Sequence, residues 1–318
     1  HLLNNKNIPP HANLKDGVNP NDESSYADFH LNDYAPELMH NEALTFLEDN
    51  KDNPFFLYYA SPLPHVPLQA PKKWVNYYKK KLGDEEPYTG KSYFPNQTPR
   101  ATYAAMISYL DEQVGDLINK LKEIGQFNNT LIIFTSDNGP TYTGGADTEF
   151  FESAKPFKTT LGWAKGFVNE GGIRVPMIAS WPGKIKSGSK SNQISAFQDM
   201  MPTFCDIVGI DPPENIDGIS IKATFLGDYQ KVKHDYLYWE FPAYKGQQAV
   251  RMGKWKGIRK NIFEGNMSIE LYNLDLDHQE QNNVALSYPE IVEKISNIMI
   301  EAHYPSSILR FKFPQLGD

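Results

Sequence analysis

The sequence predicts an α/β protein, in which a largely parallel or mixed central sheet is flanked by helices and followed by a small antiparallel α+β subdomain. Up to about residue 231, helical stretches alternate with short apolar runs of strand length. After that point the pattern changes to short strands joined by turns that contain glycine. We therefore expect an irregular lead-in over residues 1–34, an α/β core over 35–231 and the subdomain over 232–318.

The elements of the core follow from the spacing of apolar residues. Residues 35–47 and 101–124 carry them at steps of three and four, which predicts helices. Residues 54–60 and 131–135 are continuous apolar runs, typical of strands buried on both faces. The same reasoning predicts a strand over 173–181 and a short helix over 197–208.

Two other parts of the chain have their own signals. Residues 61–100 are rich in proline and polar side chains, which predicts a long, functional loop. In the subdomain, a helix over 288–302 is favoured by an apolar stripe and by the capping-box spacing of Ser287 and Glu290. Four short strands are expected before it, at 236–241, 248–252, 255–259 and 270–274.

Composition excludes several classes of protein. The chain has 31 Lys and Arg against 39 Asp and Glu, a net charge of −8 that argues against a nucleic-acid partner. No apolar run approaches the roughly eighteen residues needed to span a bilayer. The one cysteine, Cys205, excludes an internal disulfide and lies on an apolar helix face, which favours a core position. The first six residues, His1-Leu2-Leu3-Asn4-Asn5-Lys6, have neither the basic nor the apolar region that is typical of a signal peptide.

Polar residues follow the apolar run that ends at residue 135. Asp137 and Asn138 come next and are followed by Gly139-Pro140. In α/β sheets the functional crevice lies at the carboxyl ends of strands, and carboxylate and amide oxygens suit a hard cation such as calcium or magnesium. The same four residues are also typical of an ordinary turn.

Two basic side chains have settings that suit chemistry. His65 lies among three prolines, which restrict its backbone, and a positioned imidazole can act as a general acid. Lys165 lies in a glycine-flanked segment five residues before Glu170-Gly171-Gly172, where an ammonium group can hold an anionic oxygen. A histidine packed in a proline-rich turn and a solvated surface lysine are the alternatives.

Taken together and in order, these segments resemble the type I sulfatases of the alkaline-phosphatase-like superfamily. The resemblance covers nearly the whole chain from about residue 35 and is closest to bacterial arylsulfatase-type enzymes that act on sulfated glycans. The motifs that carry it are Pro64-His65-x-Pro67-Leu68, Ser136-Asp137-Asn138-Gly139, Lys165-Gly166-x-x-x-Glu170-Gly171-Gly172-Ile173-Arg174-Val175-Pro176, Trp181-Pro182-Gly183, Asp199-Met200-Met201-Pro202-Thr203, Asp217-Gly218 and Arg251-Met252-Gly253-Lys254-Trp255-Lys256.

The resemblance implies a role for each candidate residue. Asp137 and Asn138 are then calcium ligands, His65 protonates the leaving alkoxide, and Lys165 binds the sulfate. The chemistry agrees, because a sulfate ester releases its alkoxide poorly, and an acid at the leaving oxygen with cations around the sulfuryl group stabilises that step.

One family feature is absent from the sequence. Family members carry a Cys/Ser-x-Pro-Ser-Arg motif, whose first residue becomes the formylglycine nucleophile, after a pair of aspartates that complete the calcium site. Neither occurs here, since Cys205 is followed by Asp206-Ile207-Val208. We therefore expect a chain that lacks the first third of a sulfatase, has an incomplete core and calcium site, is inactive alone, and self-associates through the surface left uncovered.

The sequence thus predicts a calcium-dependent sulfuric ester hydrolase acting on a sulfated glycan or aryl sulfate, which the resemblance places in the periplasm or outside the cell. Two alternatives stay open. One is a phosphomonoester or phosphodiester hydrolase of the same superfamily, since sulfate and phosphate sites share their metal logic. The other is a non-catalytic glycan-binding protein that uses aromatic residues such as Tyr142, Trp163 and Trp239.

Overall fold

The computed structural model describes residues 13–318 and divides the chain between two units. The first unit runs to Thr130 and includes Thr141–Phe151, and the second comprises Leu131–Pro140 and Glu152–Asp318. Residues 1–12 of the expected lead-in lie outside the described part, and its remainder contains a 3-10 helix at Glu23–Phe29. The domain boundaries expected near residues 34 and 231 stay a prediction.

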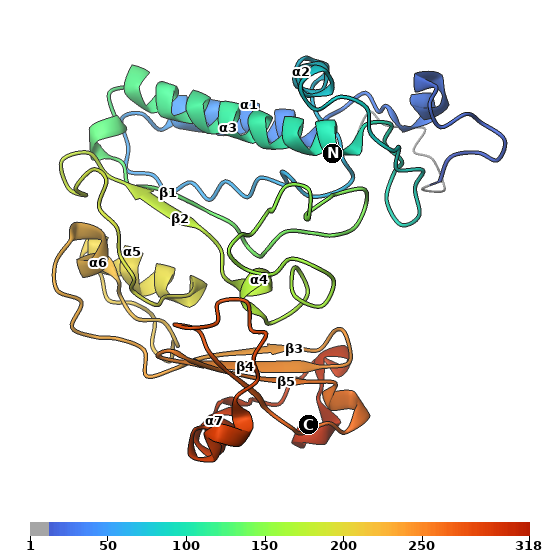
Figure 1. Cartoon of the computed structure of the whole chain (residues 1–318). Coiled ribbons are helices and arrows are strands. Elements are labelled where there is room, and N and C mark those ends of the chain that lie inside the picture. The colour runs from blue at the N-terminus through green and yellow to red at the C-terminus, as the bar shows by residue number, and fades with distance from the viewer. Residues whose placement is uncertain (1–12) are drawn as a thin grey trace. The chain divides into compact units, whose positions relative to one another are not determined.

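Three helices organise the first unit. They are α1 (Ala35–Asp49), α2 (Lys72–Leu82) and α3 (Pro99–Glu123), and α3 packs against both of the others (Figure 1). A 3-10 turn at Phe127–Asn129 follows α3. The apolar cluster of this unit joins α3 to the segment that precedes α2, through Leu63, Val66, Leu68, Tyr103, Met106 and Tyr109.

Helices α1 and α3 confirm the periodicity argument, whereas α2 was not predicted. It lies inside the expected loop over 61–100, and none of its residues is fully buried. Two of its aromatic side chains form hydrogen bonds to α3: the Trp74 indole donates to Glu112, and the Tyr78 hydroxyl shares a hydrogen bond with Ser108. The helical spacing of Trp74, Val75, Tyr78 and Leu82, all half-buried, was present in the sequence, but the proline-rich composition of residues 61–100 led to the prediction of a loop.

The strand expected over residues 54–60 is wrong. This segment is in no β-ladder, and Phe56 and Tyr58 are 69% and 77% exposed, so the apolar run does not mark a strand buried on both faces. The strand expected over 131–135 is confirmed as β1 (Ile132–Thr135). It pairs antiparallel with β2 (Met177–Ser180), and every ladder within residues 13–318 is antiparallel.

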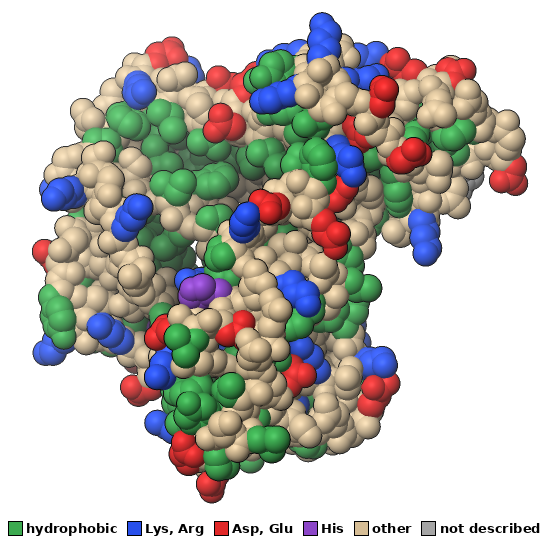
Figure 2. Space-filling model, viewed as in Figure 1, with side chains coloured by type: hydrophobic (Ala, Val, Ile, Leu, Met, Phe, Trp, Pro, Cys, Tyr) green, Lys and Arg blue, Asp and Glu red, His purple; other side chains and the backbone are tan. Residues whose placement is uncertain are grey.

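Apolar side chains on this strand pair reach the surface. Phe134 on β1 and Ile178 on β2 are 38% and 64% exposed, and apolar side chains of this kind appear in green on the face drawn in Figure 2. Exposed apolar groups on a short two-stranded ladder suit contact with other surfaces. Self-association through this surface stays a prediction.

The second unit is built on a four-stranded antiparallel sheet, which confirms the predicted subdomain. Its strands are β3 (Leu237–Phe241), β4 (Gln247–Met252), β5 (Trp255–Lys260) and β6 (Glu270–Asn273), and they pair in that order. Helix α7 (Pro289–Ala302) follows. The expected capping box is wrong, because α7 begins after Tyr288 without a side-chain cap.

Alternate residues of the sheet face two different layers. Val250 and Leu271 pack against α7, where the Cβ of any larger residue at Gly257 would lie 2.6 Å from the Ile295 side chain. Ala249, the neighbour of Val250, packs with Val168 on the opposite face. In Figure 1, α7 lies on one side of the sheet and α4 (Glu170–Ile173) on the other. We call this second side the loop face.

Smaller elements complete the second unit. The helix expected over 197–208 is confirmed as a 3-10 turn at Phe197–Asp199 that continues into α5 (Met200–Val208), and Cys205 is buried there as predicted. The remaining pieces are α6 (Lys222–Leu226) and 3-10 turns at Ile262–Glu264, Ala285–Ser287, Leu309–Phe311 and Pro314–Leu316. Within residues 13–318, no helix combines the length and apolarity that crossing a bilayer requires.

Candidate functional site

Two loops of the second unit meet beside the sheet. The Asp-Asn loop, residues 136–140, follows β1, and the Lys165 loop, residues 156–168, leads into α4. Backbone hydrogen bonds join the Asp-Asn loop to the Lys165 loop and to α4: Lys165 N donates to Pro140 O at 3.2 Å, and Gly139 N donates to Gly172 O of α4 at 2.8 Å. The structure therefore brings three predicted site residues, Asp137, Asn138 and Lys165, into one assembly.

Glycines allow this close approach. A Cβ on Gly171 would overlap Lys158 O and lie 2.6 Å from Trp163 O, both on the backbone of the Lys165 loop. Gly172 is enclosed in the same way by carbonyl groups of that loop, and a Cβ on Gly139 would overlap Gly171 O. The Gly-Gly pair after Glu170 is thus required because backbone carbonyls occupy the space of a side chain.

The Lys165 loop is also held by the loop face of the sheet. The Gln247 amide on β4 donates to Gly166 O at 3.0 Å and accepts from Val168 N at 3.4 Å. Gln247 is 1% exposed, so these bonds are shielded from water. The backbone on both sides of Phe167, two residues after Lys165, is consequently tied to the end of a strand.

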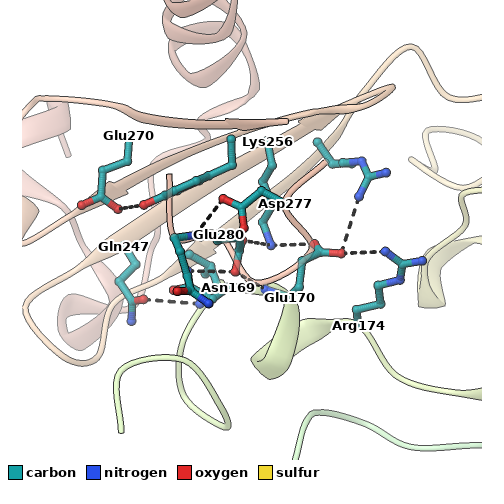
Figure 3. Close-up of polar contacts among 12 residues, drawn as sticks. Asn169, Glu170, Arg174, Gln247, Lys256, Glu270, Asp277 and Glu280 are labelled. Atoms are coloured by element: carbon teal, nitrogen blue, oxygen red, sulfur yellow. Dashed lines mark hydrogen bonds and ion pairs between the residues drawn. The ribbon is translucent and has the colours of Figure 1, made fainter. Parts of the chain in front are cut away.

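Charged side chains also link α4 to the sheet (Figure 3). The Lys256 ammonium on β5 lies 2.8 Å from Glu170 Oε1 and 3.1 Å from Glu280 Oε1. Glu170 Oε2 lies 3.1 Å from Arg174 and 3.5 Å from Arg251. Lys256 is fully buried, so its charge is compensated by these two carboxylates rather than by water.

Glu280 ties the start of α4 to the same cluster. Its Oε2 accepts from the side-chain amide of Asn169 at 3.0 Å and from Glu170 N at 2.9 Å. Because Lys256 contacts both glutamates, the sheet, α4 and the segment after β6 share one buried ionic group. We call Lys256, Glu170 and Glu280 the ionic cluster.

Sequence reasoning did not identify the ionic cluster. The sequence marks Glu170 and Lys256 only as members of family motifs. The signal that could have found Lys256 is the alternation Lys256, Ile258, Lys260, because alternate residues of a strand share one face and Ile258 is core. Glu280 lies in an irregular segment without periodicity, so no comparable signal exists for it.

The ionic cluster changes the ionisation of Glu170. Burial alone opposes the charged form, but the Lys256 ammonium, with help from Arg251 and Arg174, outweighs it and lowers the pKa of Glu170 from 4.5 to about 2. The charge on Glu170 therefore stabilises the folded state above the unfolded pKa near 4.5. That contribution is lost as the pH falls toward 2.

We expect Glu170→Gln to destabilise the protein at neutral pH by about 3 kcal/mol, with the difference from wild type shrinking between pH 4.5 and 2. Urea unfolding of both proteins at a series of pH values measures that difference, in which the titration of other carboxylates cancels. A difference that stays constant across this range would contradict the lowered pKa of Glu170.

The charged or oxygen atoms of the predicted metal and sulfate residues are available to a ligand. Within residues 13–318, the Lys165 ammonium and the Asp137 carboxylate have no hydrogen bond or ion pair, although Lys165 is half-buried. The Asn138 amide group donates to Gly139 O at 2.9 Å, which leaves its oxygen available. These groups can therefore bind a ligand without first breaking a contact.

The donor set fits part of a calcium site. One carboxylate and one amide supply at most three oxygens, of a type that Ca²⁺ prefers, whereas the ion takes about six to eight. Across the described residues, no group of three or more His, Cys, Asp or Glu side chains is placed to hold a metal. Asp137 and Asn138 are thus suited to contribute to a calcium shell that other ligands complete.

His65 lies in the first unit, on the segment between α1 and α2. Its Nδ1 lies 2.6 Å from Val66 O, and since a carbonyl only accepts, Nδ1 carries the proton. The ring also packs edge-on against Tyr93, and His65 N donates to Pro62 O at 2.8 Å. This arrangement fixes the ring and leaves Nε2 of an exposed imidazole free to exchange a proton.

Comparison with known proteins assigns these features to one family. Residues 5–210 match the family model described as Sulfatase, and residues 161–303 match the one described as N-sulphoglucosamine sulphohydrolase, C-terminal. An N-acetylglucosamine-6-O-sulfatase of Bacteroides thetaiotaomicron is 28% identical over 303 residues, which cover 89% of this chain and 50% of that protein. Human arylsulfatase A is 30% identical over 211 residues, 65% of this chain and 36% of that protein.

Solved structures agree with the sequence comparison. Ps i-CgsB, determined in complex with k-i-k-neocarrahexaose, is 29% identical with a TM-score of 0.70, and the match covers 85% of this chain and 55% of that one. The chain spans about half the length of the curated relatives it matches. Since the Sulfatase model covers more than half of the sequence and the α/β fold agrees, the chain belongs to the sulfatase family.

Proposed function

We propose that this chain carries the sulfate-binding part of a sulfuric ester hydrolase that acts on a sulfated carbohydrate. The observation that carries the proposal is the Lys165 loop, which is fixed on three sides by the Asp-Asn loop, the glycines of α4 and the loop face of the sheet. The half-buried Lys165 ammonium is left without a protein partner within residues 13–318. A fixed, uncompensated cation of this kind binds an oxyanion.

The substrate class is proposed from the relatives. Those named N-acetylglucosamine-6-O-sulfatase and N-acetylgalactosamine-6-O-sulfatase are each 28% identical to this chain. We therefore take a 6-O-sulfated amino sugar as the substrate. Action on a polysaccharide of this kind places the protein in the periplasm or outside the cell.

The chemistry follows from the two basic side chains. Lys165 binds oxygens of the sulfuryl group and stabilises the negative charge that they carry in the transition state. With Nδ1 bonded to Val66 O, His65 donates a proton from Nε2 to the leaving oxygen of the sugar. A calcium ion would be held in part by Asp137 and Asn138, and would supply further positive charge for the sulfuryl oxygens.

The first test is binding. Calorimetric titration with N-acetylglucosamine 6-sulfate is expected to show saturable binding, whereas N-acetylglucosamine is expected to show none. Lys165→Gln is expected to weaken binding by about tenfold, because it removes one charge-assisted contact. Lys184→Gln is the matched control, since Lys184 is an exposed lysine of the same unit. Equal affinity in the wild type and the Lys165 variant would overturn the proposal.

The second test is turnover. No Cys/Ser-x-Pro-Ser-Arg motif occurs in the 318 residues, so a covalent route through that nucleophile is closed to this chain by itself. We expect the purified chain to release no phenol from an aryl sulfate with or without calcium, while still binding the sulfated sugar. Release of phenol that disappears in His65→Ala would show that the chain is a complete catalyst.

A further inference from the structure

A second group of basic side chains gathers on the Lys165 loop. The Lys158 ammonium lies 4.3 Å from the centroid of the Trp163 ring, and the Lys260 ammonium lies 5.0 Å from the same centroid. Because both distances are measured to the same centroid, the two ammonium groups lie within about 9 Å of each other. Like charges this close repel one another, although the electron-rich face of an indole offsets part of that cost.

The group is held by ordered backbone on both sides. Trp163 N donates to Thr160 O at 3.0 Å, and the Trp163 carbonyl is enclosed by the close approach of Gly171. Lys260 projects from the loop face of β5, and its side chain is 23% exposed. The Lys165 loop and the sheet thus place these cations independently of each other, and neither has to fold onto a ligand.

Hydrogen-bond donors outnumber acceptors at this position. Lys260 pairs with Glu270 at 3.1 Å, but the same carboxylate oxygen also accepts from the Tyr272 hydroxyl. Within the described residues, Lys158 has no ion pair and the Trp163 indole N–H has no hydrogen bond. Glu270 is thus shared between Lys260 and Tyr272, while Lys158 has no acidic partner among the described residues, which leaves positive charge available for an anion.

We propose that Lys158, Trp163 and Lys260 bind a second sulfate group of the glycan, next to the one held by Lys165. This inference rests on the proposed function, because it assumes that the scissile sulfate lies at Lys165. Two ammonium groups and one indole N–H are three donors, which suit a tetrahedral oxyanion. Trp163 and Lys165 are two residues apart, a span of at most about 7 Å between Cα atoms, which matches sulfates on one sugar or on neighbouring sugars.

The test compares two forms of one disaccharide of uronic acid and N-acetylglucosamine, sulfated either at the 6-O position alone or at both the 2-O and 6-O positions. We expect the disulfated form to bind the wild-type chain more tightly by about tenfold, in a manner that weakens with added salt. Lys158→Gln and Lys260→Gln are each expected to lower the affinity for the disulfated form by about fivefold. The affinity for the monosulfated form is expected to stay within about twofold of the wild type.

A spectroscopic measurement locates the second sulfate. The chain has five tryptophans, and in protein labelled with 5-fluorotryptophan the resonance of residue 163 is assigned through Trp163→Phe. We expect this resonance to shift with the disulfated disaccharide and to stay in place with the monosulfated one. Inorganic sulfate at equal concentration distinguishes a general anion site, and an equal shift with it would overturn the assignment to a glycan.

The matched control is Lys254→Gln. Lys254 also lies over an indole, that of Trp255 at 5.2 Å, but in the turn before β5, at the opposite end of this strand from Lys260. The Lys254→Gln variant is expected to bind both disaccharides with the affinity of the wild type. Equal loss in this variant, or no loss in the Lys158 and Lys260 variants, would overturn the proposal.

The two proposals fail separately. If Lys165→Gln weakens both disaccharides while the Lys158 and Lys260 variants bind as wild type, the second sulfate site is wrong and the proposed function stands. If Lys165→Gln leaves the affinity for both disaccharides unchanged while the Lys158 and Lys260 variants lose affinity for the disulfated one, Lys165 does not bind the scissile sulfate. In that case an anion still binds at Trp163, but it is not a second sulfate beside a scissile one.

Discussion

Lys256→Met is expected to lower the free energy of unfolding by about 3–5 kcal/mol, the largest effect of any single substitution considered for this chain. The substitution removes the cation between Glu170 and Glu280 and leaves two buried carboxylates facing each other. The remaining cations near Glu170 are arginines that lie more than 3 Å from it and do not pair with Glu280. Urea unfolding at neutral pH measures the loss.

A second substitution keeps this prediction testable where the single variant fails to fold. Adding Glu280→Gln to Lys256→Met removes one of the two uncompensated charges, so part of the lost stability is expected to return. Lys254→Met is the control, since Lys254 is exposed at the turn before β5 and is expected to change stability by less than about 0.5 kcal/mol. Additive losses from Lys256→Met and Glu280→Gln would contradict the coupling.

Gly171→Ala is expected to destabilise the fold by at least about 2 kcal/mol and to abolish binding of the sulfated sugar. The added methyl group meets Lys158 O and Trp163 O, which are backbone atoms and cannot turn away as a side chain can. The Lys165 loop must therefore move as a whole. Thermal unfolding and calorimetric titration of the variant measure the two effects.

Gly115→Ala is the matched control for that substitution. Gly115 lies inside α3, and a Cβ there would meet nothing within 4 Å. Alanine is the better helix former, so this variant is expected to gain up to about 1 kcal/mol. A Gly171 variant that keeps both wild-type stability and sugar binding would show that the close packing of α4 against the Lys165 loop does not hold the site.

The sequence predicted those elements whose apolar spacing matches the burial they reach. One face of the long helix α3 packs against an apolar cluster, and its apolar residues recur at helical spacing. The strands β3–β6 are short and separated by turns, and the sheet is covered on both faces. The apolar run over residues 54–60 gave a wrong prediction of a buried strand, because Phe56 and Tyr58 are apolar and yet exposed. Apolar composition alone does not report whether a neighbouring element covers a side chain.

The candidate site was predictable only in part, for a related reason. Lys165 and Asp137 stand out because glycine and proline surround them, and turn residues are visible in a single sequence. Their support is not local: Gln247, Lys256 and Glu280 are distant in sequence and act through long-range contacts. The alternation of Lys256 with the core residue Ile258 indicates the face on which Lys256 lies, but not the carboxylates that compensate its charge.

The central claim is that the ionic cluster and the α4 glycines hold Lys165 as a free cation for a sulfate ester. The ammonium signal of Lys165, observed by NMR in lysine-labelled protein and assigned through Lys165→Gln, tests it most directly. Titration with N-acetylglucosamine 6-sulfate is expected to shift this signal to saturation, and N-acetylglucosamine is expected to leave it in place. A Lys165 signal that does not move while the sulfated sugar binds elsewhere on the chain would contradict the account.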